Sequence, residues 1–177
     1  IISSIFYNHF NELVTEMPGT FEGRNAFIKT NIGEARLYGF DLRADYNFYE
    51  ENIFYATASY VKGDDLTTGG SLPEIPPLNG NTGIRLNLLE NLKADFFATV
   101  FAGQNKAATG ELTTPGYAYF NFYLDAGTFN FSSVNFRITG GIENIFNKEY
   151  RNHLSTTRGY LTTEPGRNLF IKLITKF

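Results

Sequence analysis

The chain has 177 residues, a formal net charge of −3 and no cysteine, which excludes disulfides and thiolate metal sites. The charges are scattered and form no basic stripe, so no nucleic-acid partner is expected. A mean hydropathy of −0.22 does not exclude a membrane, because membrane barrels place lipid-facing residues only at alternate positions. No apolar run approaches the roughly 20 residues of a membrane-spanning helix. The even composition predicts a single domain over 1–177.

Apolar and polar side chains alternate along most of the chain, which is typical of strands with two unlike faces. In the segment 92–102, Lys93 and Asp95 share one parity, while Phe96 and Ala98 share the other. The same separation of charged from uncharged positions occurs in four more segments, 40–48, 81–88, 136–143 and 168–177. Eight long strands are therefore predicted, at 2–14, 33–49, 52–62, 80–89, 92–103, 117–131, 134–146 and 168–177.

The connections between these strands alternate between long and short. The short ones are the polar pairs Glu50-Glu51, Glu90-Asn91 and Ser132-Ser133. The long ones hold most of the proline, and they span 15–32, 63–79, 104–116 and 147–167. This pattern predicts an all-β, antiparallel up-and-down meander with every long loop at one end, as in outer-membrane barrels.

Aromatic residues are predicted to form two bands, one near each end of the strands. The band near the short turns contains Tyr46, Phe48, Tyr49, Phe54, Tyr55, Phe129, Phe131, Phe136 and Phe177. The band near the long loops contains Tyr60, Phe101, Tyr117, Tyr119, Phe146 and Tyr150. Two such bands resemble the interfacial girdles of membrane barrels. A soluble lipocalin-type barrel shares the alternation with its apolar face turned inward, but the strand lengths and one-sided loops favour the membrane barrel.

No pattern in the sequence indicates an enzyme. His9 and His153 are the only histidines, and neither lies near a nucleophile or a carboxylate pair of the kind that hydrolases use. His153 falls in the last long loop, where it could reach an iron complex or haem, although a lone loop histidine is more often solvated. We therefore expect no catalytic residue, no resident metal and no cofactor.

The charges on the polar parity are expected to line a wet interior and to pair with one another. They are Asp41, Arg43, Asp45, Arg85, Lys93, Asp95, Arg137, Glu143 and Lys172.

Two stretches near the end of the chain carry a resemblance to a known family. The segment Glu143-Asn144-Ile145-Phe146-Asn147-Lys148-Glu149-Tyr150 is similar to the E-N-L-F-N/D-K-x-Y motif of TonB-dependent receptors. Pro165-Gly166-Arg167, followed by a strand ending in Phe177, resembles their closing motif and terminal aromatic. Earlier, 31–42 and 72–77 are similar to two further strand-entry patterns of the family.

The resemblance implies the C-terminal portion of a 22-stranded transmembrane barrel in the bacterial outer membrane, without its plug domain and earlier strands. It also implies energised uptake of a scarce nutrient, with iron chelates, haem or cobalamin favoured over glycans. The implied partners are outer-membrane lipid, the plug domain, the TonB protein, the barrel-assembly machinery and a small-molecule ligand. A complete eight-stranded barrel with a structural or adhesive role remains the alternative, and a soluble ligand-binding barrel is a third.

Ligand contacts are expected from the long loops, which face the medium in such barrels. Arginine and tyrosine suit an anionic, aromatic chelate. The candidates are Arg24, Tyr38, His153, Arg158 and Tyr160. The resemblance assigns a scaffold role to Glu143, Asn144, Phe146, Tyr150, Pro165, Gly166 and Arg167, and an assembly-signal role to Phe177.

Overall fold

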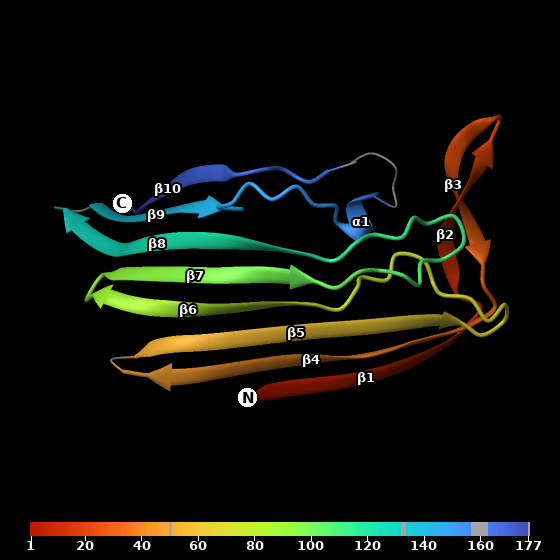
Figure 1. The fold of residues 1–177 in the computed structure, drawn as a ribbon, viewed down its shortest axis with the longest axis horizontal. Coiled ribbons are helices and arrows are strands. Elements are labelled where there is room, and N and C mark those ends of the chain that lie inside the picture. The colour runs from red at the N-terminus through yellow and green to blue at the C-terminus, as the bar shows by residue number, and fades with distance from the viewer. Residues whose placement is uncertain (50, 132–133, 157–162, 177) are drawn as a thin grey trace.

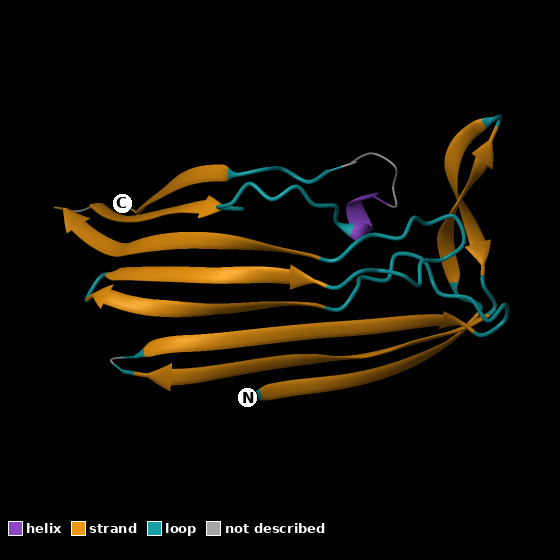
Figure 2. Cartoon of the chain, viewed as in Figure 1, coloured by secondary structure: helices purple, strands orange, loops and turns teal. Residues whose placement is uncertain are grey.

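The computed structural model describes residues 1–49, 51–131, 134–156 and 163–176, and they form an almost entirely β structure (Figures 1 and 2). Eight strands make one antiparallel sheet in the order β1-β4-β5-β6-β7-β8-β9-β10. Their bounds are β1 (Ile2–Asn11), β4 (Glu34–Phe48), β5 (Asn52–Asp65), β6 (Asn79–Leu89), β7 (Leu92–Phe101), β8 (Tyr117–Phe131), β9 (Val134–Glu143) and β10 (Asn168–Lys176). A separate hairpin contains β2 (Val14–Phe21) and β3 (Arg24–Asn31), and α1 (His153–Thr156) is a single helical turn.

The predicted meander is confirmed, with sequential strands side by side and the long connections gathered at one end (Figure 1). Strands β1 and β10 form the two opposite edges and do not pair with each other. The eight strands therefore form an open sheet and not a closed barrel of their own. Within the described ranges, no helix is long and apolar enough to cross a bilayer.

The first long connection was expected to be a loop, and this expectation is wrong. Residues 15–32 contain most of the β2–β3 hairpin, which projects away from the large sheet (Figure 1). Glu22 and Gly23 form its tip with φ values of 49° and 75°, the pair of positive values that a type I′ turn requires. The Pro18-Gly19 pair had suggested a loop, but proline is tolerated in edge strands.

The strand expected at 134–146 ends earlier, at Glu143. Asn144 adopts a φ of 49°, a left-handed conformation that asparagine tolerates better than most residues and that breaks the extended backbone. The other strand bounds differ from the expected ones by only a few residues.

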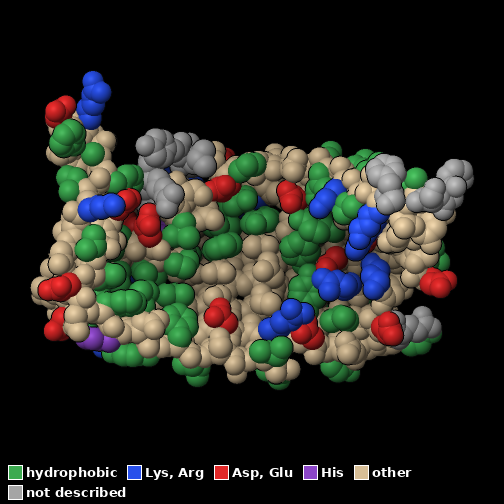
Figure 3. Space-filling view, turned by 180° about the vertical axis from the view of Figure 1, so that it is seen from behind, with side chains coloured by type: hydrophobic (Ala, Val, Ile, Leu, Met, Phe, Trp, Pro, Cys, Tyr) green, Lys and Arg blue, Asp and Glu red, His purple; other side chains and the backbone are tan. Residues whose placement is uncertain are grey.

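The sheet keeps the parity of the sequence across its ladders, so its two faces differ in charge. Arg85 pairs with Asp95, and Ile84 pairs with Phe96 on the opposite face. We call the first the polar face and the second the apolar face. The charges of the polar face gather over the half of the sheet near the short turns (Figure 3).

The apolar face is not packed into an interior. Phe96 is 42% exposed and Ile171 is 85% exposed. Among the residues that the structure describes, the one cluster of buried hydrophobic residues is small. It lies at the long-loop end and contains Ile32, Ala35 and Leu72. The arrangement that would contradict a membrane barrel, with apolar rows enclosed and ionic rows outside, is not what the sheet shows.

The predicted aromatic girdle near the long loops is only partly correct. Phe101 pairs with Tyr117 on the polar face, where the two rings stack with centroids 4.9 Å apart. Tyr60 pairs with Phe40 on the apolar face. These residues therefore lie at the expected end of the strands, but several of them, such as Phe101 and Tyr117, lie on the polar face and not on the apolar face. Phe131 and Phe177 of the other band lie outside the side chains that the structure describes.

A charge on the apolar face should destabilise the protein more than the same charge on the polar face. We expect Phe96→Lys to cost about 2–4 kcal/mol of unfolding free energy at mid-membrane depth. Ile174→Lys is the matched control, because Ile174 is 40% exposed but pairs with Arg137 on the polar face. Urea unfolding of the full receptor in lipid vesicles would measure both. A larger loss for Ile174→Lys than for Phe96→Lys would mean that the faces have been assigned the wrong way round, and equal losses would mean that the two faces do not differ in their surroundings.

Candidate functional site

The polar face is held together by paired charges and tyrosine hydroxyls. Arg85 donates from Nη2 to Asp95 Oδ2 at 2.6 Å, and Tyr55 Oη donates to Asp95 Oδ1 at 2.8 Å. The same carboxylate therefore joins β5, β6 and β7. Further pairs on this face are Arg43–Asp45, Arg137–Asp125, Ser59–Asp41 and Thr99–Asn81. Of the nine charges expected to pair with one another, four do so, as Arg43–Asp45 and Arg85–Asp95, and Arg137 pairs with Asp125 instead.

Two tyrosines reach their carboxylates by lying across glycines. A Cβ built on Gly83 would approach Tyr55 Oη to 2.8 Å, and one built on Gly141 would approach Tyr123 Cδ1 to 2.5 Å. Tyr123 then donates to Glu143 Oε1 at 2.9 Å. A glycine in a strand leaves its surface open, and an aromatic ring on the neighbouring strand can cover it. Tyr55 was expected only in the aromatic band near the short turns, and no sequence pattern marked Tyr123.

Asn144 organises the end of β9. Its backbone N–H donates to Asn121 Oδ1 at 3.0 Å, and both asparagines are buried. Its side-chain amide binds both backbone groups of Lys148. Nδ2 donates to the Lys148 carbonyl at 2.8 Å, and Oδ1 accepts from the Lys148 N–H at 2.7 Å. The motif therefore closes a compact turn on top of the strand.

Asn147 and Gly166 join this turn to the return of the chain toward β10. Asn147 Oδ1 accepts from the Arg167 N–H at 2.9 Å. A Cβ on Gly166 would meet that same oxygen at 2.5 Å, so only glycine lets the two segments approach this closely. Glu143 adds a second link, because its Oε2 accepts from Asn168 Nδ2 at 3.1 Å.

Tyr150 places its ring in an aromatic stack on the polar face. Its centroid lies 4.6 Å from that of Tyr117 and 4.8 Å from that of Tyr119. Burial, helped by Tyr119, raises the pKa of the Tyr150 hydroxyl above its ordinary value. Below the stack, Tyr119, Tyr123, Glu143 and Arg167 line a cavity of about 440 Å³. This cavity combines aromatic walls with charged groups and is the main candidate for solute contact on this face.

A buried carboxylate connects three of the long loops. Glu111, whose side chain is 3% exposed, accepts from the Glu74 N–H at 2.7 Å and from the Ala108 N–H at 3.0 Å. His153 Nε2 lies 3.6 Å from Glu111 Oε2, and His153 Nδ1 is in hydrogen-bond contact with Thr114 Oγ1 at 3.3 Å. Loops 66–78, 102–116 and 144–167 therefore meet at Glu111, which we call the loop hub. No sequence pattern marked Glu111.

The candidate ligand residues are placed in different environments. Arg24 is exposed near the tip of the hairpin. Tyr38 lies on the apolar face, paired with Tyr7 and Lys62. His153 is 1% exposed, so its interpretation as a solvated loop residue is wrong. Arg158 and Tyr160 lie outside the described residues, as does Phe177. In the part of the chain that is described, no group of three or more His, Asp or Glu could hold a metal ion.

The fold and its two unlike faces define a segment of a membrane-type β-barrel wall. The family model described as TonB dependent receptor-like, beta-barrel matches residues 3–145, so the chain belongs to this family.

Several solved structures share the fold. The copper transporter OprC superposes with a TM-score of 0.81 at 22% identity, covering 97% of this chain and 28% of that one. The ferric enterobactin receptor PfeA from Pseudomonas aeruginosa gives 0.67 at 15% identity, with 98% and 28% covered. The siderophore receptor PirA from Acinetobacter baumannii gives 0.63 at 18% identity, with 98% and 29% covered. The chain thus spans less than a third of the length of these proteins. No sequence match to a curated protein was found.

We predict that Gly141→Ala destabilises the wall by about 1–3 kcal/mol, because the new methyl overpacks against Tyr123 and displaces its ring. Gly140→Ala is the matched control, since the nearest atom to its Cβ would be 3.4 Å away, and its effect should stay within about 0.5 kcal/mol. Thermal unfolding of the full receptor in detergent would compare the two. Equal stability of both variants would contradict the role given to the tyrosine–glycine contact.

We also predict that Glu111→Ala loosens the loops without unfolding the sheet. The Glu74 and Ala108 N–H groups lose their acceptor, at about 0.5–1.5 kcal/mol for each hydrogen bond. Hydrogen exchange of loops 66–78 and 102–116 should quicken, while exchange in β7 and β8 stays unchanged. Glu149→Ala removes an exposed carboxylate from the same loop region and should leave exchange as it is. Unchanged protection in the Glu111 variant would rule out the loop hub.

Proposed function

We propose that this chain is part of the barrel wall of a TonB-dependent receptor in the bacterial outer membrane. The observation that carries the proposal is the separation of charge between the two faces, in a chain whose family is shown by the match over residues 3–145. Lipid tolerates the charge-free centre of the apolar face, and the paired ionic face suits a wet interior. We place the short turns on the periplasmic side and the loop hub on the external side, because outer-membrane barrels have short periplasmic turns and longer extracellular loops.

Within such a receptor, we assign residues 1–177 to the C-terminal portion of the barrel. The motif around Asn144 and the Pro165–Arg167 segment support this position, because they stand in the order expected for the closing strands. We propose that Glu143, Asn144, Phe146, Tyr150, Pro165, Gly166 and Arg167 act as scaffold. Their contacts support that role, since they fix the end of β9 and the entry to β10.

The proposed activity is transport and not catalysis. A ligand is captured by the outer loops, a plug domain moves when TonB transmits energy, and the solute passes to the periplasm. The barrel supplies the wall and the loops, and its lipid contact and assembly involve outer-membrane lipid and the barrel-assembly machinery. The family supports this class of activity, because its members are transporters.

We propose an iron chelate, haem or cobalamin as the solute, with a siderophore first. Two of the solved relatives are siderophore or ferric enterobactin receptors, and a third is a copper transporter. Arg24 at the hairpin tip and the aromatic cavity beside Tyr150 are the contacts we favour. Tyr38 suits solute contact less well, since it has the parity of the lipid-facing side. The small structural or adhesive barrel finds less support, since the described strands leave both sheet edges open.

Uptake by a deletion strain tests this proposal. Loss of the full gene should abolish growth when one iron chelate or haem is the sole source of iron, or when cobalamin must be taken up from the medium. The intact gene should restore that growth. Restoration should fail in a strain that lacks TonB, because energy no longer reaches the plug. Growth on all of these sources in the deletion strain, or restored growth without TonB, would overturn the proposal.

A further inference from the structure

The apolar face changes in character toward the long loops. Successive cross-strand rows there are Leu42–Ala58, then Ile5–Phe40–Tyr60, then Tyr7–Tyr38–Lys62, then His9–Arg36–Asp64. Each row lies about 7 Å beyond the previous one, since two strand residues separate them. A charge-free surface thus gives way to aromatic rings and then to cations within two rows. This is the order of surroundings that a side chain meets on leaving hydrocarbon for lipid headgroups.

The cations in these rows are arranged around one carboxylate. Asp64 lies 2.8 Å from Arg36 Nε and 3.1 Å from Lys62 Nζ. Its side chain is 17% exposed, against 39% for Arg36 and 33% for Lys62, so the positive groups are outermost. Both cations also lie 5.6 Å from the Tyr38 ring centroid. The Nη groups of Arg36 make no hydrogen bond to any residue in the described ranges, and the nearest further carboxylate along the strand, Glu34, belongs to the next row outward.

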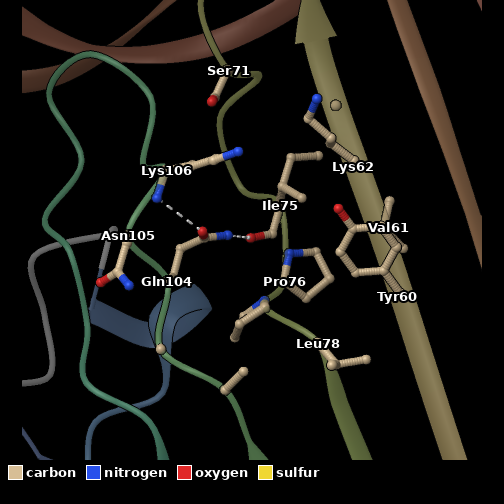
Figure 4. A pocket seen from close by; sticks show the side chains of 14 residues that line it. Tyr60, Val61, Lys62, Ser71, Ile75, Pro76, Leu78, Gln104, Asn105 and Lys106 are labelled. Atoms are coloured by element: carbon tan, nitrogen blue, oxygen red, sulfur yellow. Dashed lines mark hydrogen bonds between the residues drawn. The ribbon is translucent and has the colours of Figure 1, made fainter.

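Lys62 also lines a cavity of about 260 Å³ between β5 and two loops. Tyr60 and Lys62 form one side of it and Lys106 stands on the other (Figure 4). Tyr60, Lys62 and Ala102 have the parity of the apolar face, so residues of that face contribute to the lining of the cavity. Gln104 braces the loops around it by donating to the Ile75 carbonyl at 2.9 Å. Lys106 forms no ion pair with any residue whose placement is described.

A shallow groove continues from this cavity toward the centre of the sheet. Its volume is about 310 Å³, and it shares Leu78 and Ala102 with the cavity. The side chains that open it on the apolar face are small, because Ala58 pairs with Gly80 and Ala56 pairs with Thr82. An apolar trough therefore ends at two lysines.

We propose that this surface binds a phosphorylated membrane lipid, with the phosphate between Lys62 and Lys106 beside Arg36 and one acyl chain in the Ala58–Gly80 groove. Arginine and lysine supply charge-assisted donors to phosphate oxygens. The groove supplies apolar contact along the chain, so both halves of one amphiphile are matched. The inference rests on the proposed orientation of the apolar face toward lipid.

Native mass spectrometry of the full receptor, stripped of lipid and titrated with dioleoyl phosphatidic acid, tests the site. Arg36→Gln/Lys62→Gln should weaken binding about tenfold or more, in line with the loss of two cations at a lipid surface. Ala58→Leu fills the groove, keeps every charge and should also weaken binding. The matched controls are Lys93→Gln/Lys172→Gln on the polar face and Ala118→Leu on the apolar face outside the groove, and both should bind as the unaltered receptor does.

Two further arms separate the sources of phosphate. Dioleoylglycerol, which has the same chains without phosphate, should bind weakly, and inorganic phosphate should not displace the lipid. Unchanged affinity in the charge or groove variants, equal binding of dioleoylglycerol, or displacement by inorganic phosphate would each overturn the proposal. If the charge variant does not fold, an affinity of the unaltered receptor that does not fall with added salt would overturn it as well. Solute uptake is a separate readout, so loss of the lipid site leaves the proposed transport standing.

Discussion

The structure depends on keeping charge off the central part of one face of a sheet. Strand side chains point to alternate faces, so a single shift of register would carry every ionic group to the opposite side. The ladders between β4 and β10 avoid this, and two bulges, after Asn87 and after Asp125, absorb extra residues without mixing the faces of the central sheet. The short turns between neighbouring strands contain as few as two residues. All of the long connections lie at the other end of the sheet.

Charge on one face brings its own cost, because carboxylates and guanidinium groups in a confined wall need partners. The wall meets this need with contacts that cross several strands. Asp95 serves two donors from two other strands, and Tyr123 reaches Glu143 across Gly141. Each such contact ties neighbouring strands by side chains in addition to the backbone ladder. The polar face is therefore part of what fixes the strands in register.

Much of this could be read from the sequence because the alternation of residues is a local property. The eight long strands and the separation of Lys93 from Phe96 follow from parity, and the order of the strands follows from the alternation of long and short connections. The β2–β3 hairpin was missed because Pro18-Gly19 is a strong loop signal, while the Glu22-Gly23 turn is a weak one. Tyr117 and Phe101 were assigned to a lipid-facing girdle from their position along the strands, and this position does not distinguish the two faces of the sheet. Glu111 could not be found at all, since two of its partners, Glu74 and His153, lie more than thirty residues away in the chain.

The loop hub shows why the outer end of this wall behaves differently from the sheet below it. A strand is held by a ladder of many hydrogen bonds, so the loss of one changes little. Loops 66–78, 102–116 and 144–167 instead converge on a single buried carboxylate, and a buried carboxylate without donors is costly. Moving a neighbouring loop away removes the Glu74 donor or the His153 contact from Glu111 and leaves the remaining loops less stable in their positions. The loops are therefore coupled to one another more strongly than their separation in the sequence suggests, while the paired polar face holds the strands beneath them in place.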